Sequence, residues 1–229
     1  MIILACATQR ECLSALDGIS APPKAWPAPM RFKSQDLLAC VVGIGPIAAA
    51  LHIGILLEQY PHTTGIINLG ICGTYDSKNI PMLSTCIADA EIFPEYGIRC
   101  SSDEQEMPFA HQMLPDLSLT PPHRLNLTPY SAAKNMGLNL PQSWPVGHSI
   151  TVSGVSGDRK RADILNFQYM AATENMEGFA LALAAHKYNI PFLEVRTVSN
   201  IVGIQDKSQW KIRQALTALS KILPTLIAS

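Results

Sequence analysis

Two short segments of the sequence carry carboxylates where a carboxylate can do chemistry. Glu11 follows shortly after an apolar run at residues 2–7, and a carboxylate just after a first strand can activate water or protonate a leaving group. Glu174 and Glu177 lie three residues apart at a predicted helix start and so share a face, where a carboxylate can accept hydrogen bonds from vicinal hydroxyls. The alternatives are an exposed glutamate at position 11 and, for the pair, charges that stabilise a helix N-terminus.

Three glycine-bearing turns, at residues 43–45, 70–73 and 154–157, follow predicted strands. Each would present free backbone N–H groups at a strand end, and the ligands of open α/β sheets gather at the carboxyl ends of the strands. The alternative is that each glycine only makes its turn. Because Ala48 stands where a dinucleotide-binding motif has its third glycine, we expect no such cofactor. The six histidines show no spacing typical of a metal site, so no metal is expected either.

The elements that must position these residues are predicted by hydrophobic patterns. Buried strands of an α/β sheet are expected from four short runs rich in Ile, Val and Leu, at residues 2–7, 37–42, 65–70 and 192–198. Helices are expected at residues 47–58, 175–187 and about 207–223. We therefore predict one domain over residues 1–229, with a proline-rich excursion at about 101–145 that serves as a lid over the site or as part of a subunit interface.

Composition narrows the class of partner. The 229 residues suffice for one buried core. With 17 basic and 18 acidic side chains, the chain has no positive excess for nucleic acid, and the expected partner is a small molecule. Because only 15% of the residues are charged, we expect apolar surface to be covered in a homodimer or a larger homo-oligomer.

The apolar segments and the cysteines bear on location. No stretch reaches the roughly 20 apolar residues of a membrane span, and the run at residues 2–7 has no basic leader. The six cysteines form no C-x-x-C pair and are expected to be reduced and structural. These features predict a cytoplasmic protein without a membrane partner.

Six segments occur in the order in which the nucleoside phosphorylase and nucleosidase superfamily has them. They are Ala7-Thr8-Gln9-Arg10-Glu11, Gly43-Ile44-Gly45-Pro46-Ile47-Ala48-Ala49-Ala50, Asn68-Leu69-Gly70-Ile71-Cys72-Gly73, Ser156-Gly157-Asp158, Glu174-Asn175-Met176-Glu177-Gly178 and Arg196-Thr197-Val198-Ser199-Asn200. Within the superfamily, the chain resembles the methylthioadenosine/adenosylhomocysteine nucleosidases and, most closely, the futalosine hydrolases. The resemblance implies a three-layer αβα sandwich with a central mixed, twisted sheet.

The resemblance also implies roles for individual residues. Glu177 would bind the ribose hydroxyls and Met176 would pack against the sugar. Glu11 would position and deprotonate the attacking water. The expected substrate-binding set further includes Asn175, Gly70, Cys72, Ser156, Gly157 and Trp210. Trp210 is a candidate apolar wall of the site, with core packing as the alternative.

Asn200 stands where adenine-specific nucleosidases carry an aspartate. A carboxamide can donate to O6 or N7 of hypoxanthine, whereas an ionised carboxylate would face O6 with like polarity. Asn200, the second expected catalytic residue beside Glu11, therefore favours a 6-oxopurine nucleoside as substrate. The implied reaction is hydrolysis of futalosine to hypoxanthine and dehypoxanthine futalosine, a step of menaquinone biosynthesis.

Other functions remain open at this point. One is a phosphorolytic enzyme, for which Arg10 could hold phosphate, and another is a methylthioadenosine/adenosylhomocysteine nucleosidase. A rival of another class is a non-catalytic nucleoside-binding protein, against which the presence of both Glu11 and Glu177 argues. The basic run at residues 159–161 is either a solvated face or a contact for the benzoate carboxylate of futalosine.

Overall fold

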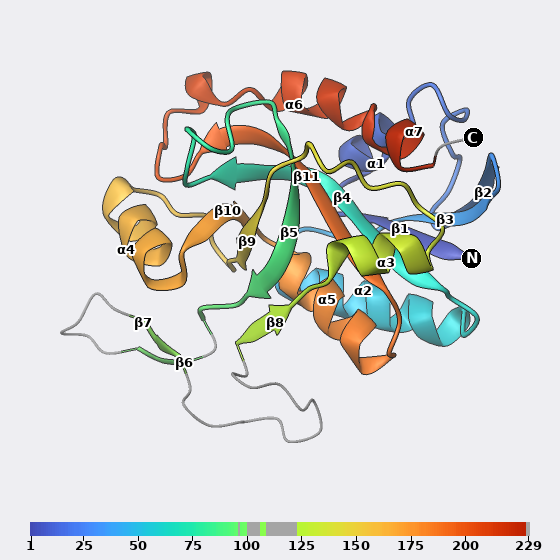
Figure 1. Ribbon diagram of the computed structural model, residues 1–229, viewed down its shortest axis with the longest axis horizontal. Helices are drawn as coiled ribbons and strands as arrows, with labels where there is room; N and C mark the ends of the chain where they lie inside the picture. The colour runs from blue at the N-terminus through green and yellow to red at the C-terminus, as the bar shows by residue number, and fades with distance from the viewer. Residues whose placement is uncertain (96, 100–105, 109–122, 228–229) are drawn as a thin grey trace.

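A nine-stranded mixed sheet forms the centre of the computed structural model, which describes residues 1–95, 97–99, 106–108 and 123–227 (Figure 1). Its strands are β1 (Ile2–Cys6), β2 (Ala28–Phe32), β3 (Gln35–Val41), β4 (Gly65–Thr74), β5 (Thr85–Ile92), β8 (Arg124–Asn126), β9 (Val146–Thr151), β10 (Ala171–Asn175) and β11 (Phe192–Ile201). They are ordered β10-β9-β5-β11-β4-β1-β3-β2, and β8 pairs with β5. Two further strands, β6 (Gly97–Arg99) and β7 (Glu106–Pro108), form a separate antiparallel pair.

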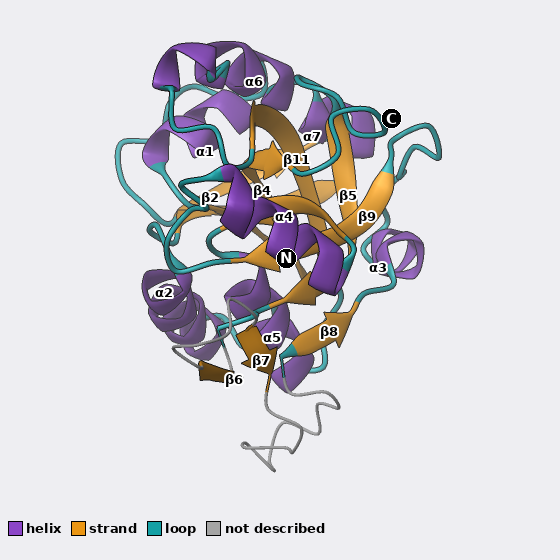
Figure 2. Cartoon of the chain, turned by 90° about the vertical axis from the view of Figure 1, so that its left-hand side faces the viewer, coloured by secondary structure: helices purple, strands orange, loops and turns teal. Residues whose placement is uncertain are grey.

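Helices cover both faces of this sheet. They are α1 (Gln9–Ala15), α2 (Pro46–Gln59), α3 (Pro129–Asn135), α4 (Arg159–Tyr169), α5 (Gly178–Lys187), a 3-10 turn at Lys207–Gln209, α6 (Ile212–Leu219) and α7 (Ile222–Leu226). Helices α1, α6 and α7 lie on one face, and α2 and α5 lie on the other (Figure 2). The predicted three-layer αβα sandwich with a mixed sheet is therefore confirmed.

The first strand shows why its sequence is apolar throughout. Successive side chains of a strand point to opposite faces. Ile2 and Leu4 accordingly join the core beneath α1, α6 and α7, while Ile3 and Ala5 join the core beneath α2 and α5. Because helices cover both faces, neither set of side chains meets water.

The parallel strands β1, β4 and β11 are neighbours, so their carboxyl ends meet at one edge of the sheet. The four predicted strands are present, but β4 continues to Thr74 and pairs with β11 over this added length. Residues 70–73 are therefore strand, and the predicted turn there was wrong. The cause is the partner strand, whose residues up to Ile201 satisfy the backbone of β4.

Two predicted helices differ from the observed ones. Residues 171–175 form β10, and α5 begins only at Gly178, because the Asn175 side chain accepts hydrogen bonds from the N–H groups of Glu177 and Gly178 and makes a turn. The expected helix at 207–223 is divided into a 3-10 turn, an extended Trp210 and two short helices. Here the backbone N–H of Lys211 donates to Ser199 O at 2.7 Å, which ties this segment to β11.

The proline-rich excursion at 101–145 is described at residues 106–108 and 123–145, and the rest of it lies outside the described residues. Where it is described, β8 and α3 are elements that its pattern did not predict. The five cysteines in the described ranges are buried and free, and Cys100 lies outside them. Each helix within those ranges is too short or too polar to span a lipid bilayer.

Candidate active site

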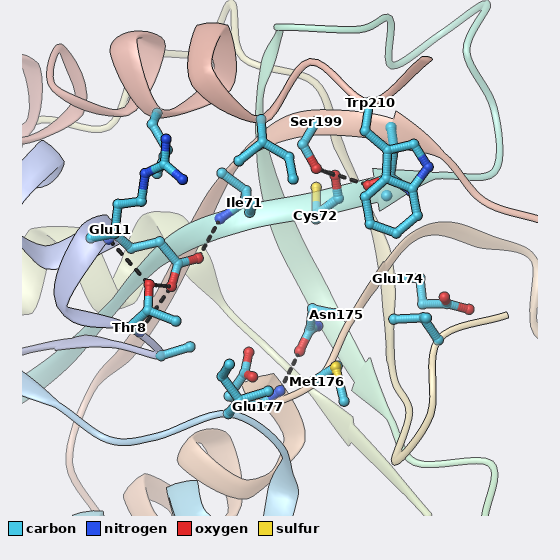
Figure 3. Close-up of a pocket in the computed structure, with 18 residues that line it drawn as sticks. Thr8, Glu11, Ile71, Cys72, Glu174, Asn175, Met176, Glu177, Ser199 and Trp210 are labelled. Carbon is cyan, nitrogen blue, oxygen red and sulfur yellow. Dashed lines mark hydrogen bonds between the residues drawn. The ribbon is translucent and has the colours of Figure 1, made fainter. Parts of the chain in front are cut away.

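A cavity of about 420 Å³ opens at the edge where β1, β4 and β11 end (Figure 3). Seven of the ten residues predicted for the site line it, namely Glu11, Cys72, Asn175, Met176, Glu177, Asn200 and Trp210. The other three, Gly70, Ser156 and Gly157, do not line it. Its wall is mainly apolar, with a few polar groups directed inwards, as is typical of a site for a small molecule.

Glu11 is buried rather than exposed, although it lies in the first turn of α1. Thr8 caps this helix, because its side-chain oxygen accepts a hydrogen bond from the Glu11 backbone N–H at 3.2 Å. In return, the Glu11 carboxylate accepts hydrogen bonds from Thr8 N at 3.0 Å and Thr8 Oγ1 at 2.8 Å. Its other oxygen accepts from Ile71 N at 3.0 Å. Three donors therefore fix one carboxylate at the wall of the cavity (Figure 3).

Gly70 lies behind Glu11, where a side chain would not fit. A Cβ at this position would lie 2.7 Å from Glu11 Oε1 and 3.0 Å from Arg196 Nη1. The same Arg196 nitrogen donates to Ile71 O at 3.2 Å. The function of Gly70 in this arrangement is to leave room for a carboxylate and a guanidinium.

Glu177 occupies the opposite wall, at the N-terminus of α5. Its Oε1 accepts a hydrogen bond from Gly45 N at 3.0 Å, and its Oε2 lies 3.7 Å from Arg196 Nη1. Gly45 has a φ of 89°, a conformation that favours glycine and turns its N–H towards the carboxylate. Burial raises the pKa of Glu177, and the charge of Arg196 and the Gly45 hydrogen bond oppose this effect.

The sequence suggested that Glu174 and Glu177 share a helix face, and the structure shows that they do not. Glu174 belongs to β10, and its carboxylate accepts hydrogen bonds from Tyr75 Oη at 2.6 Å, Ser156 N at 2.9 Å and Ser156 Oγ at 2.6 Å. Both of its oxygens are therefore engaged with protein groups. Two residues predicted for the substrate site lie nearby. Ser156 contacts the Glu174 carboxylate, and Gly157 faces the Gln205 side chain, which would be the nearest group to a Cβ at this position.

Asn200 ends the cavity on the β11 side. The pairing of β11 with β4 shifts register between Val198 and Asn200, which places Asn200 opposite Gly73. A bulge of this kind redirects side chains at a strand end. Ser199 Oγ lies 2.8 Å from Asn200 Oδ1 and 3.0 Å from Cys72 O, and its one proton can be donated to either acceptor. Asn200 Nδ2 donates to Ile201 O at 3.4 Å, which leaves its second hydrogen available as a donor.

Trp210 forms an apolar wall of the cavity on the side of Ser199 (Figure 3). Its indole N–H donates to Ile204 O at 2.9 Å, which fixes the ring and satisfies its one donor. The sequence left open whether Trp210 lines the site or packs in the core, and its position agrees with the first of these interpretations.

The basic run at residues 159–161 lies on α4 and does not line the cavity. Arg159 pairs with Asp163 at 3.1 Å, and Arg161 pairs with Glu95 at 3.4 Å. Arg10 is the one basic side chain among the described residues of the cavity wall. No three His, Cys, Asp or Glu side chains in the described part of the chain are grouped to hold a metal ion.

Arg196 and Glu194 were missed as parts of the site. They are two residues apart on β11 and so point to the same face of a largely buried strand. Buried charges are almost always paired, so this spacing within a strand is a signal that sequence reasoning could have used.

Three buried carboxylates, those of Glu11, Glu174 and Glu177, line one mainly apolar cavity together with the carboxamides of Asn175 and Asn200. Such a set of groups is typical of an enzyme site for a small molecule. The chain belongs to the phosphorylase superfamily, whose family model matches residues 30–228. The futalosine hydrolase of Streptomyces coelicolor is 31% identical over 201 residues, which cover 83% of this chain and 79% of that protein. The futalosine hydrolase of Acidothermus cellulolyticus is 30% identical over 233 residues, covering 100% and 90%.

The solved structure of futalosine hydrolase from Helicobacter pylori has the same fold. It matches with a TM-score of 0.75 and covers 98% of this chain and 95% of that one, at 12% sequence identity. The architecture of the sheet and its helical layers is thus shared with a chain of very different sequence.

Proposed function

We propose that this protein hydrolyses the N-glycosidic bond of a 6-oxopurine nucleoside and that futalosine is its preferred substrate. The observation that carries the proposal is the placement of Glu11 and Glu177 on one cavity, each held by its own donors, with Asn200 at a third position. These three groups match the three parts of the reaction, which are water, ribose and base.

Glu177 is assigned to the ribose. A carboxylate can accept hydrogen bonds from two vicinal hydroxyls, and the Gly45 N–H and Arg196 occupy only one side of each oxygen. Met176 lies beside it on the wall and offers an apolar contact to the sugar. This binding energy fixes C1′ of the ribose relative to the other two groups.

Asn200 is assigned to the base. One hydrogen of the Asn200 NH2 group points to Ile201 O at 3.4 Å, and the other is available to donate to O6 or N7 of the departing purine. Negative charge grows on the purine as the bond to C1′ breaks, and a donor aimed at it stabilises the transition state. Trp210 supplies an apolar surface next to this position.

Glu11 is assigned to the nucleophile. Breaking the glycosidic bond leaves positive charge on C1′ and the ring oxygen, and a water molecule must then lose a proton as it attacks. A fixed carboxylate can accept that proton and also stabilise the adjacent positive charge. The three hydrogen bonds to Glu11 hold it in place for this step.

Water is favoured over phosphate as the nucleophile. A phosphate site requires several cationic or N–H donors, and Arg10 is the one basic side chain among the described residues of the wall. Arg10 is also exposed rather than directed by neighbouring groups. Futalosine is favoured as the substrate because the relatives from Streptomyces coelicolor and Acidothermus cellulolyticus are futalosine hydrolases.

The purified protein should be incubated with futalosine, inosine, adenosine and methylthioadenosine, each with and without inorganic phosphate. We expect hypoxanthine from futalosine, free sugar rather than sugar phosphate, and no phosphate requirement. A strict phosphate requirement would support a phosphorylase, and preferential release of adenine would support a methylthioadenosine/adenosylhomocysteine nucleosidase. Binding of the nucleosides without any product would support a non-catalytic nucleoside-binding protein.

We further propose that the protein is a homodimer formed through α2. This helix packs one side on the sheet and exposes Ile47, Leu51 and Ile55, which are 85%, 61% and 46% exposed and form one stripe at four-residue spacing. Ile44 continues the stripe to the cavity wall. A second copy with the same stripe would cover it and would lie next to the substrate site.

The five buried free cysteines of the described residues support a cytoplasmic location, because the cytoplasm is a reducing compartment.

A further inference from the structure

A second group of charged residues lies behind the cavity wall. Glu91 on β5 and Glu194 and Arg196 on β11 are buried, with exposed fractions of 0%, 1% and 3%. None of the three lines the cavity. Burying three charges is expensive unless each is paired, so their arrangement needs a physical reason.

Arg196 connects this group with the cavity. Its Nε donates to Glu194 Oε1 at 2.6 Å, and its Nη1 lies 3.7 Å from Glu177 Oε2. Glu194 thereby anchors one end of the guanidinium, and the other end reaches the carboxylate assigned to the ribose.

The carboxyl groups of Glu91 and Glu194 converge beside Gly178. A Cβ added at Gly178 would lie 2.5 Å from Glu194 Oε2 and even closer to Glu91 Oε1, so these two oxygens face the same buried space. Asn175 Nδ2 lies 2.8 Å from Glu91 Oε1 and 3.3 Å from Glu194 Oε1, whereas Glu194 Oε2 is buried without a hydrogen-bond partner among the described residues. A proton on Glu91 or Glu194 supplies the missing donor between the two carboxyl groups. Because Arg196 lies against Glu194, the proton belongs on Glu91. Burial and the charge of Glu194 both raise the pKa of Glu91 well above its ordinary value.

Asn175 provides a second connection. Its Nδ2 donates to Glu91 Oε1 at 2.8 Å, and its Oδ1 accepts from Glu177 N at 2.8 Å. Thr151 Oγ1 donates to Glu91 Oε2 at 2.6 Å and so fixes the other oxygen of Glu91. The acid pair is thus linked to the side chain of Glu177 through Arg196 and to its backbone through Asn175.

We propose that Glu91 and Glu194 are positioning residues, a buried acid pair that shares one proton and sets the place of Glu177 through Arg196 and Asn175. The inference rests on the proposed function in that Glu177 binds the ribose. The pair keeps a single negative charge beside Arg196, whereas two ionised carboxylates would repel each other and displace the guanidinium. Neither residue touches the substrate.

The first test compares Glu194→Gln with Glu91→Gln, with the exposed Glu58→Gln as matched control. Glu194→Gln removes the anion that anchors Arg196, and a misplaced Glu177 should lower kcat/KM for inosine by about 100-fold. Glu91→Gln is also neutral and keeps a donor towards Glu194, so the loss should be only about 3-fold, the value of an imperfect hydrogen bond. Equal losses, or the reverse order, would overturn the proposal.

The second test separates positioning from a general effect on folding. The same variants are assayed with inosine and with 2′-deoxyinosine, which lacks one hydroxyl for Glu177. If Glu194 acts through Glu177, the loss in kcat/KM caused by Glu194→Gln should be several-fold smaller for the deoxynucleoside. An identical loss with both substrates would show that Glu194 only supports the fold.

The third measurement needs no substrate. An infrared difference spectrum between the wild-type protein and Glu91→Gln at pH 7 should contain the carbonyl stretch of a protonated carboxylic acid. Absence of this band would overturn the shared proton. If the band is present but no nucleoside is cleaved, the acid pair stands and the proposed function fails, so the two failures can be told apart.

Discussion

The carboxylate of Glu11 and the backbone N–H of Ile71 are joined by a hydrogen bond of 3.0 Å, although 60 residues separate them along the chain. This bond joins α1 to the end of β4 and fixes the position of one carboxylate oxygen of Glu11. The carbonyl of Ile71 accepts from Arg196, so the backbone of one residue contacts both Glu11 and Arg196.

Glu11→Gln tests the assignment of the nucleophile. The amide keeps the size of the side chain but cannot accept a proton from water, so kcat should fall by about a hundred- to ten-thousand-fold, the usual contribution of a general base. KM should change little, because the ribose and the base have other partners. Hypoxanthine release under saturating substrate measures the effect, with Glu58→Gln as control; near-wild-type turnover would contradict the assignment.

Gly70→Ala tests the packing behind Glu11. The added Cβ would lie 2.7 Å from Glu11 Oε1 and 3.0 Å from Arg196 Nη1, and both groups are held by other hydrogen bonds. We expect a loss in kcat/KM of about 100-fold, as is typical when a catalytic group is displaced by about 1 Å. Gly54→Ala is the matched control, because nothing lies within 4 Å of a Cβ there. If Gly70→Ala is as active as Gly54→Ala, the close packing has no functional meaning.

Asn200→Asp tests the choice of base. An ionised carboxylate repels O6 of hypoxanthine but can accept from the amino group of adenine. The ratio of kcat/KM for inosine to that for adenosine should therefore fall by about 10- to 100-fold, the effect of one mismatched hydrogen bond. The exposed Asn135→Asp should leave this ratio unchanged. A ratio unaffected by Asn200→Asp would place the base elsewhere in the cavity.

Glu177→Gln tests whether the carboxylate assigned to the ribose lowers the stability of the folded protein. Because burial raises the pKa of Glu177, the folded state favours its protonated form, and its ionisation lowers the free energy of unfolding as the pH rises above the ordinary glutamate range. The glutamine side chain is neutral, so at pH 7 the variant should have a Tm about 2 °C or more above that of the wild type. Its kcat/KM should fall by about 10- to 100-fold through weaker bonds to the ribose.

The raised pKa of Glu177 also predicts how the rate of the wild-type enzyme falls at acidic pH. As the pH falls through the raised pKa of Glu177, the carboxylate gains a proton and loses an acceptor, so KM should rise at a higher pH than for an ordinary glutamate. Initial rates between pH 4 and 8 give this limb, which should disappear in Glu177→Gln. A lower Tm in the variant together with an unchanged acid limb would show that Glu177 is mainly structural.

Leu51→Glu tests the proposed dimer. A carboxylate in the centre of the α2 stripe would be buried without a partner between two copies, so the variant should be monomeric in analytical ultracentrifugation while the wild type is dimeric. Phe167→Glu is the control, because Phe167 is 85% exposed on α4, away from the stripe. A monomeric wild type, or a Leu51→Glu variant that stays dimeric, would rule out this interface.

The sequence predicts four of the buried strands, because unbroken apolar runs occur where helices cover both faces of a sheet, and it predicts the helix that follows Gly45-Pro46. It also identified Glu11, Glu177 and Asn200, since these types of residue in the motifs of a known superfamily carry their chemistry with them. All three line the cavity of the structure.

Which side chains meet in the site depends on how distant segments of the chain fold together. Gly45 N and Glu177 Oε1 are bonded across 132 residues, and the Asn175 turn overrides a helical pattern that local periodicity favours. Periodicity reports how each segment is buried, but the contacts that hold a carboxylate in place are made by strands brought together from distant parts of the chain. For that reason Arg196, which no local pattern connects with Glu177, emerged as the residue that links the ribose carboxylate to the acid pair behind it.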